Sequence, residues 1–131
     1  MALDGARQEM QEMLGTVPSA FDRIPDEFID SEWDLMKRVQ YGETLIPNRY
    51  KELIGVAVAA VTRCPYGTRL HAELARLHGA TEAEVAEAVH YAALVSAWGT
   101  QMTALAPDLD GFNTEVDQTV RYLAKSQGLE L

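Results

Sequence analysis

Apolar residues in this chain recur at helical spacing, and this periodicity limits the fold more than any other feature does. Between Phe28 and Val39, apolar side chains stand at positions 28, 29, 33, 36 and 39, which lie along one side of an α-helix. No segment shows the sustained period-two alternation that is typical of a half-buried strand. The pattern therefore predicts an all-α fold of about six to seven helices.

Proline and glycine set the predicted helix boundaries. Pro25, Pro47 and Pro65 each stand where a first helical turn accepts proline. Thr81 and Glu84 have the spacing of a capping box, which predicts a helix start at Thr81. We expect a short helical turn between residues 18 and 25, a loop at 107–111, a last helix capped at 113 or 114, and helices over about 2–14, 25–41, 47–63, 65–79 and 81–105.

Two of these helices contain a stretch with few charges. The stretch from Leu53 to Val61 has no charged residue, so this helix is predicted to be buried on most sides. The later stretch from Ala86 to Ala97 is rich in alanine, which permits close helix packing. Together with the apolar excess, this favours contacts between subunits and predicts a homo-oligomer.

Composition excludes several classes of protein. The 131 residues are enough for one domain over 1–131, and a 47% hydrophobic content predicts a globular chain. The net charge of −9 argues against binding to a nucleic-acid backbone. The longest apolar run is too short to cross a membrane, and residues 1–15 do not have the pattern of a signal peptide. One cysteine, and hence no disulfide framework, suits a reducing compartment, so we expect a cytoplasmic location.

The segment from Glu52 to Thr81 carries the residues with the clearest chemical potential. Cys64 precedes Pro65 and lies at a helix N-terminus, where exposed amides and the helix dipole favour a thiolate. His71 follows almost two turns later on the same face. If the helices before and after Cys64 pack antiparallel, Glu52 and His71 fall at similar depths. A carboxylate beside an imidazole is an arrangement for general acid–base catalysis.

Each of these residues also has a structural interpretation. Cys64 is alternatively an inert packing residue, and Glu52 with His71 a buried polar pair that holds two helices in register. Cys64, His71 and His78 recur every seven residues, but seven residues of helix rise about 10 Å, too far for one ion. We therefore predict neither a metal nor a cofactor. The same rise keeps His71 from deprotonating Cys64 directly.

Three segments in order resemble the core of the alkylhydroperoxidase D and carboxymuconolactone decarboxylase superfamily. They are Glu52-Leu-Ile-Gly-Val-Ala-Val-Ala-Ala, then Cys64-Pro-Tyr-Gly-Thr-Arg-Leu-His71, then Gly79-Ala-Thr-Glu-Ala-Glu-Val-Ala-Glu-Ala. The similarity covers about residues 41–100, and its order and spacing are more specific than any single motif. The resemblance implies a compact all-α fold that assembles as trimers or hexamers.

The two branches of this superfamily imply different chemistry. In the peroxidase branch a glutamate, a Cys-x-x-Cys pair and a histidine form the site, and Glu52, Cys64 and His71 match three of those positions. Gly67 stands at the second cysteine, which in that branch attacks the peroxide. The decarboxylase branch lacks the cysteine pair and uses acid–base groups around a histidine, which Arg69 and His71 resemble.

The leading hypothesis is a divergent, thiol-dependent antioxidant peroxidase of the alkylhydroperoxidase D type. Cys64 would form a sulfenic acid that an external thiol resolves, with Glu52 and His71 as a proton relay. Tyr66, Arg69 and Trp98 are the predicted binding residues for a small-molecule substrate. One alternative is a decarboxylase that acts on a small carboxylated lactone, and another is a helical assembly protein without activity.

Overall fold

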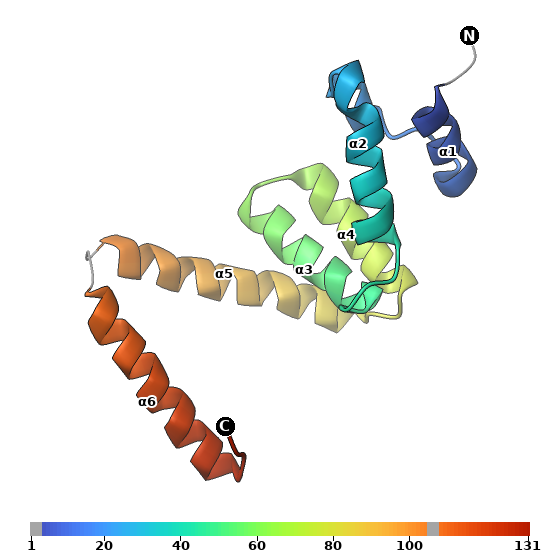
Figure 1. The fold of residues 1–131 in the computed structure, drawn as a ribbon. Coiled ribbons are helices and arrows are strands. Elements are labelled where there is room, and N and C mark those ends of the chain that lie inside the picture. The colour runs from blue at the N-terminus through green and yellow to red at the C-terminus, as the bar shows by residue number, and fades with distance from the viewer. Residues whose placement is uncertain (1–3, 105–107) are drawn as a thin grey trace. The chain divides into compact units, whose positions relative to one another are not determined.

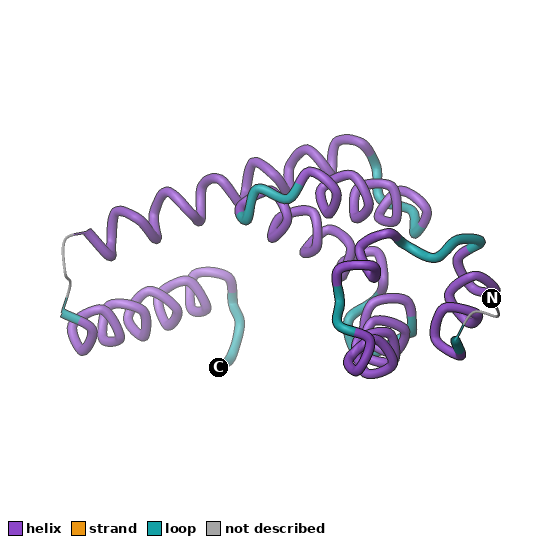
Figure 2. The backbone as a smooth tube through the Cα atoms, turned by 90° about the horizontal axis from the view of Figure 1, so that it is seen from above, coloured by secondary structure: helices purple, strands orange, loops and turns teal. Residues whose placement is uncertain are grey.

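The computed structural model describes residues 4–104 and 108–131, and every regular element in these ranges is helical (Figures 1 and 2). The prediction of an all-α fold is therefore confirmed. The elements are α1 (Gly5–Leu14), the 3₁₀-helix η1 (Ser19–Arg23), α2 (Asp26–Met36), the π-helix η2 (Lys37–Tyr41), α3 (Asn48–Val61), α4 (Pro65–Leu77), α5 (Glu82–Ala104) and α6 (Leu109–Gln127).

The chain separates into two compact units, residues 1–89 and residues 90–131. The first unit holds α1 to α4 and the first two turns of α5, and the second holds the rest of α5 and α6. All the predicted site residues except Trp98 lie in the first unit. The prediction of a single domain stays a prediction.

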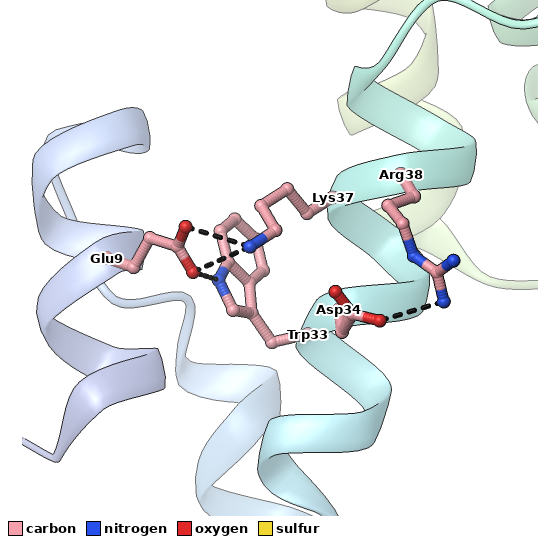
Figure 3. Close-up of polar contacts among 5 residues, drawn as sticks. All are labelled: Glu9, Trp33, Asp34, Lys37 and Arg38. Carbon is pink, nitrogen blue, oxygen red and sulfur yellow. Dashed lines mark hydrogen bonds and ion pairs between the residues drawn. The ribbon is translucent and has the colours of Figure 1, made fainter.

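The first unit contains a small core where α1 meets α2. Trp33 is buried there, and its ring packs edge-on against Phe21 with the ring centroids 6.3 Å apart. The Trp33 indole nitrogen donates to Glu9 at 2.8 Å, and Lys37 reaches the same carboxylate at 2.8 Å (Figure 3). These contacts fix α1 against α2, so Trp33 belongs to the core.

The hairpin of α3 and α4 is the part of the fold that carries the predicted site (Figure 1). The two helices pack side by side through Val56, Ala72 and Ala75. The turn between them places Arg63 in the left-handed region, with φ of 57°. The amide of Cys64 then donates to the carbonyl oxygen of Ala59 at 2.9 Å, which ends α3 and aims the chain into α4.

The prediction that residues 53–61 are buried on most sides is wrong for the described chain. α4 covers one face of α3, where Glu52, Val56 and Ala59 are buried. Ile54, Val58 and Val61 lie on another face and are each about half exposed. The uncharged sequence reflects an apolar stripe that no other described segment of the first unit covers.

The capping box at the start of α5 is confirmed. The amide of Glu84 donates to the Thr81 hydroxyl at 3.1 Å, and the amide of Thr81 donates back to the Glu84 carboxylate at 2.8 Å. Arg49 of α3 also pairs with Glu84. This one carboxylate thus closes the first turn of α5 and ties it to α3.

In the second unit, α6 begins earlier than predicted. Its N-cap is Asp108 rather than Asn113 or Thr114, and the amide of Phe112 donates to the Asp108 carbonyl at 3.0 Å. A Cβ at Gly111 would lie 2.7 Å from an oxygen of the Asp108 carboxylate, which is the end of a flexible side chain and can move aside. The predicted end of the preceding helix at Leu105 lies outside the described residues.

Among residues 4–104 and 108–131, no helix has both the length and the apolar content needed to cross a membrane.

Candidate active site

Glu52 and His71 face each other across the α3–α4 hairpin. The distance between Nδ1 of His71 and Oε2 of Glu52 is 2.6 Å. The Glu52 side chain is 3% exposed and that of His71 is 23% exposed, so the contact is largely shielded from water. The predicted proximity of these two residues is confirmed, while their catalytic role stays a prediction.

Glycine at position 55 makes this contact possible. A Cβ on Gly55 would lie 2.6 Å from both Cγ and Nδ1 of His71, closer than real side chains approach. Gly55 follows Glu52 by three residues and therefore lies on the same face of α3. The imidazole rests directly on the backbone of α3, and this holds the ring against the carboxylate.

The partner of each ring nitrogen determines what His71 can do. An ionised carboxylate only accepts hydrogen bonds, so with Glu52 ionised Nδ1 of His71 is the donor and Glu52 orients the ring. Nε2 makes no hydrogen bond to any residue that the structure describes. It is therefore the nitrogen available to exchange a proton with a bound molecule.

Cys64 is the N-cap of α4. Its Sγ accepts a hydrogen bond from the amide of Gly67 at 3.3 Å, and the residue is exposed. An amide donor at a helix N-terminus stabilises a thiolate. No hydrogen bond joins Cys64 to Glu52 or His71 within the described ranges, in agreement with the predicted separation along the helix.

Gly67 occupies the position of the missing second cysteine, and its backbone is close to Cys64. A Cβ built on Gly67 would lie 3.7 Å from Cβ of Cys64 and 3.2 Å from its Sγ. Disulfides have Cβ atoms about 3.8 Å apart on average. The backbone at positions 64 and 67 thus matches the spacing of a disulfide in a chain that has one cysteine.

Tyr41 stands close enough to both Glu52 and Tyr66 to interact with them, and sequence reasoning identified only Tyr66. Burial raises the pKa of Tyr41, and the neighbouring Tyr66 phenol and Glu52 carboxylate raise it further. Tyr41 ends η2, and Lys51 holds that end by donating to the carbonyl oxygen of Gly42 at 2.9 Å. A π-helix is a frequent mark of functional sites, but its hydrogen bonding is not visible in the sequence.

A shallow groove of about 600 Å³ runs beside Cys64 along α4. It brings Cys64 and the predicted binding residue Arg69 to one surface, whereas Glu52 and His71 do not line it. The lining residues are Arg63, Cys64, Pro65, Thr68, Arg69, Ala72, Glu73 and Arg76. Arg63 was not predicted as a binding residue. Its left-handed backbone depends on tertiary structure and cannot be predicted from an arginine in the sequence.

The remaining predictions receive less support from the geometry. Trp98 is exposed in the second unit, so its binding role stays a prediction. Tyr66 is exposed on the first turn of α4. In the part of the chain that the structure describes, no three histidine, cysteine, aspartate or glutamate side chains gather in a way that would hold a metal ion.

The helical fold around this hairpin is that of the alkylhydroperoxidase D-like proteins. The crystal structure of the alkylhydroperoxidase AhpD core from Rhodospirillum rubrum superimposes with a TM-score of 0.63 at 22% identity, over 82% of each chain. Residues 30–108, more than half of the sequence, match the carboxymuconolactone decarboxylase family, and the chain belongs to that family.

Two other relatives are more similar in sequence. Uncharacterized protein 4 in the cox locus of Paracoccus denitrificans is 38% identical over 80 residues, which are 61% of this chain and 68% of that protein. A protein from Methanobacterium thermoautotrophicum is 36% identical, with a TM-score of 0.53 over 65% of this chain and 95% of that one. Neither description names an activity.

Proposed function

We propose that this chain is a thiol-dependent enzyme that reduces hydroperoxides with one cysteine, Cys64. The observation that carries the proposal is the hydrogen bond from the Gly67 amide to the Cys64 sulfur at the start of α4. Cys64 is an exposed residue and lines an open groove, so a small substrate can approach it. The family match and the AhpD-like fold agree with this class of reaction.

The cycle needs two reductant thiols for each peroxide. The Cys64 thiolate attacks the terminal oxygen of a hydroperoxide, the O–O bond breaks, and the alkoxide leaves as an alcohol after taking a proton. Cys64 is then a sulfenic acid. A first external thiol forms a mixed disulfide with it and releases water. A second thiol attacks this disulfide, which regenerates Cys64 and releases the oxidised reductant.

The Glu52–His71 pair supplies the proton in this proposal. Glu52 holds Nδ1, so Nε2 is the exchanging atom. Nε2 of the neutral ring first accepts the proton of the Cys64 thiol through a chain of water molecules, because seven helical residues separate the two groups by about 10 Å. The imidazolium then returns this proton through the same waters to the leaving alkoxide. A reaction that depends on reducing thiols suits the predicted cytoplasmic location.

The oxidation of Cys64 provides a direct test. The protein is mixed with a stoichiometric hydroperoxide and with dimedone, which traps sulfenic acids, and is then weighed by mass spectrometry. We expect one dimedone adduct on the Cys64 peptide and none in Cys64→Ser. An unmodified Cys64 peptide together with an unchanged peroxide concentration would contradict the proposal.

The hydrogen-bonded pair itself favours a second candidate, a decarboxylase that acts on a small carboxylated lactone. Nε2 of His71 makes no hydrogen bond to the described residues, so it would take up a second proton and then, as part of the imidazolium, protonate the developing carbanion, while Arg69 would hold the carboxylate. The groove places Arg69 with Cys64 rather than with His71, and this supports the peroxidase more. Lactone turnover that falls in His71→Ala would favour the decarboxylase, and no turnover by the wild type would exclude it.

We also propose that the protein is a homo-oligomer, a trimer or a hexamer. Tyr50, Ile54, Val58 and Val61 form an exposed apolar stripe along α3, and each is about half exposed. Such a stripe on a helix marks a surface for a partner helix. Size-exclusion chromatography of the wild type and of Val58→Asp tests this: we expect the variant to dissociate, and a monomeric wild type contradicts the proposal.

The third candidate is an assembly protein without catalytic activity. It would share the oligomeric state and the buried Glu52–His71 contact. It is the interpretation that remains if neither hydroperoxides nor lactones are consumed.

A further inference from the structure

The groove beside Cys64 is basic, although the chain as a whole carries a net charge of −9. Its lining contains three arginines and a single carboxylate, Glu73. Arg76 is compensated, because it contacts Glu73 at 3.1 Å and donates to Glu82 at 2.8 Å. The groove's uncompensated charges are therefore those of the other two arginines.

Arg63 and Arg69 form no ion pair with any residue that the structure describes, and both are exposed. Arg63 immediately precedes Cys64, and Arg69 lies on α4 in the same lining. The left-handed backbone of Arg63 is one that glycine or asparagine adopts more easily. Two unpaired guanidinium groups beside a thiol are suited to binding carboxylates. Each guanidinium group can bind a carboxylate with two parallel hydrogen bonds.

We propose that this groove binds the external reductant of Cys64, and that this reductant is a small thiol that carries at least one carboxylate. The inference rests on the proposed peroxidase function, because a chain without a second cysteine needs an external thiol. A volume of about 600 Å³ is in the range of small-molecule sites. Carboxylates held by Arg63 and Arg69 keep the incoming thiol next to the sulfur that it attacks.

The charge favours the reductant over the peroxide as the ligand of the groove. A hydroperoxide is compact, and its reacting group is neutral, so it gains little from two guanidinium groups. An anionic thiol is attracted to the two arginines in both reductive steps of the cycle, since each step brings a negatively charged molecule to Cys64. The positive charges of the two arginines would raise the local concentration of the anionic thiol at the groove, although the protein as a whole is acidic.

The attack of the external thiol on the Cys64 sulfur, the first reductive step, can be measured without any peroxide. Cys64, the chain's sole cysteine, is first converted to its mixed disulfide with 2-thiopyridine, and a reducing thiol then releases the chromophore. The probes are 3-mercaptopropionate, which is anionic, and 3-mercaptopropionamide, which has nearly the same size and is neutral. Each rate is divided by the rate of the same thiol with a small pyridyl disulfide, which removes intrinsic reactivity.

Two variants and a matched control complete the design. Arg63→Asn removes one charge and keeps a residue that tolerates the left-handed turn, and Arg69→Gln removes the other. Arg23→Gln removes an equal charge from an exposed residue of η1, beside the α1–α2 core. We expect the wild type to prefer the anionic thiol and each groove variant to lose about two- to fivefold of that preference.

The outcomes separate this inference from the proposed function. Equal preferences in the wild type, Arg63→Asn and Arg69→Gln would overturn the inference, and so would an equal loss in Arg23→Gln. A wild type that prefers the anionic thiol but never consumes hydroperoxide would instead contradict the proposed function and leave a carboxylate-binding groove. Added sodium chloride should reduce the anionic preference of the wild type and leave the neutral rate unchanged.

Discussion

The imidazole of His71 lies directly against Gly55, so that a Cβ on this glycine would be 2.6 Å from Cγ of the ring. Gly55→Ala should therefore push the ring away from Glu52. Alanine is about 1 kcal/mol better than glycine within a helix, yet we expect a net loss of about 1–2 kcal/mol of unfolding free energy from the clash and the broken contact.

Gly99 provides the matched control for this change. It lies within α5, and a Cβ there would meet nothing within 4 Å. Gly99→Ala should be neutral or stabilise the protein by up to about 1 kcal/mol in urea unfolding. If Gly55→Ala is as stable as Gly99→Ala, the ring does not rest on the glycine as the structure indicates.

Because the Glu52 carboxylate is buried against His71, we expect the effects of substitutions at these two residues on stability to depend on each other. His71→Leu leaves the Glu52 side chain, which is 3% exposed, without its partner. We expect the free energy of unfolding to fall by about 3–5 kcal/mol. The double variant Glu52→Leu with His71→Leu should recover at least half of this loss, because no buried charge remains. A double variant less stable than His71→Leu would contradict this explanation.

The backbone around Gly67 predicts that a disulfide can be restored. In Gly67→Cys, the new Cβ would lie about 3.7 Å from Cβ of Cys64, close to the average for disulfides, while the Cβ of Ala59 at 3.1 Å has to shift slightly. We expect mild oxidation to form an intramolecular disulfide, seen as a mass lower by two hydrogen atoms. The wild type cannot form this bond, and a variant that only dimerises would show that the spacing is wrong.

Glu84 predicts a pH-dependent contribution to stability. The hydrogen bond from the Thr81 amide and the contact with Arg49 lower the pKa of Glu84 below its ordinary value of 4.5. A lowered pKa means that the contribution is complete above pH 4.5 and is lost as the pH falls through the lowered value. Glu84→Gln should melt below the wild type at neutral pH, and the gap should close in acid.

Glu87→Gln is the control for Glu84, since Glu87 is exposed on the same helix and forms no ion pair with the described residues. Its melting temperature should stay near that of the wild type across the pH range. A gap for Glu84→Gln that does not change with pH would assign its effect to packing rather than charge.

Features that depend on local chemistry were predictable from the sequence. The capping box at Thr81 and Glu84 and the N-cap at Cys64 are determined by a few neighbouring residues, and both are confirmed. The Glu52–His71 contact was predictable because an antiparallel helix pair places those two positions at similar depths. Family resemblance added the identity of the fold.

Features that depend on tertiary structure were not predictable. Tyr41 reaches the Glu52 region through a π-helix, which has no sequence signature. The groove charge of Arg63 depends on a left-handed turn that arginine rarely adopts. The exposure of Val58 and its neighbours was missed because an uncharged helix is equally consistent with a core and with an apolar surface stripe.

Steady-state consumption of a hydroperoxide tests the central claim most directly. The protein is incubated with cumene hydroperoxide, with and without excess 3-mercaptopropionate, and the remaining peroxide is followed over time. We predict that each chain consumes one peroxide without the thiol and many with it, and that Cys64→Ser consumes none in either case. A wild type that matches Cys64→Ser, with the thiol present, would contradict the account.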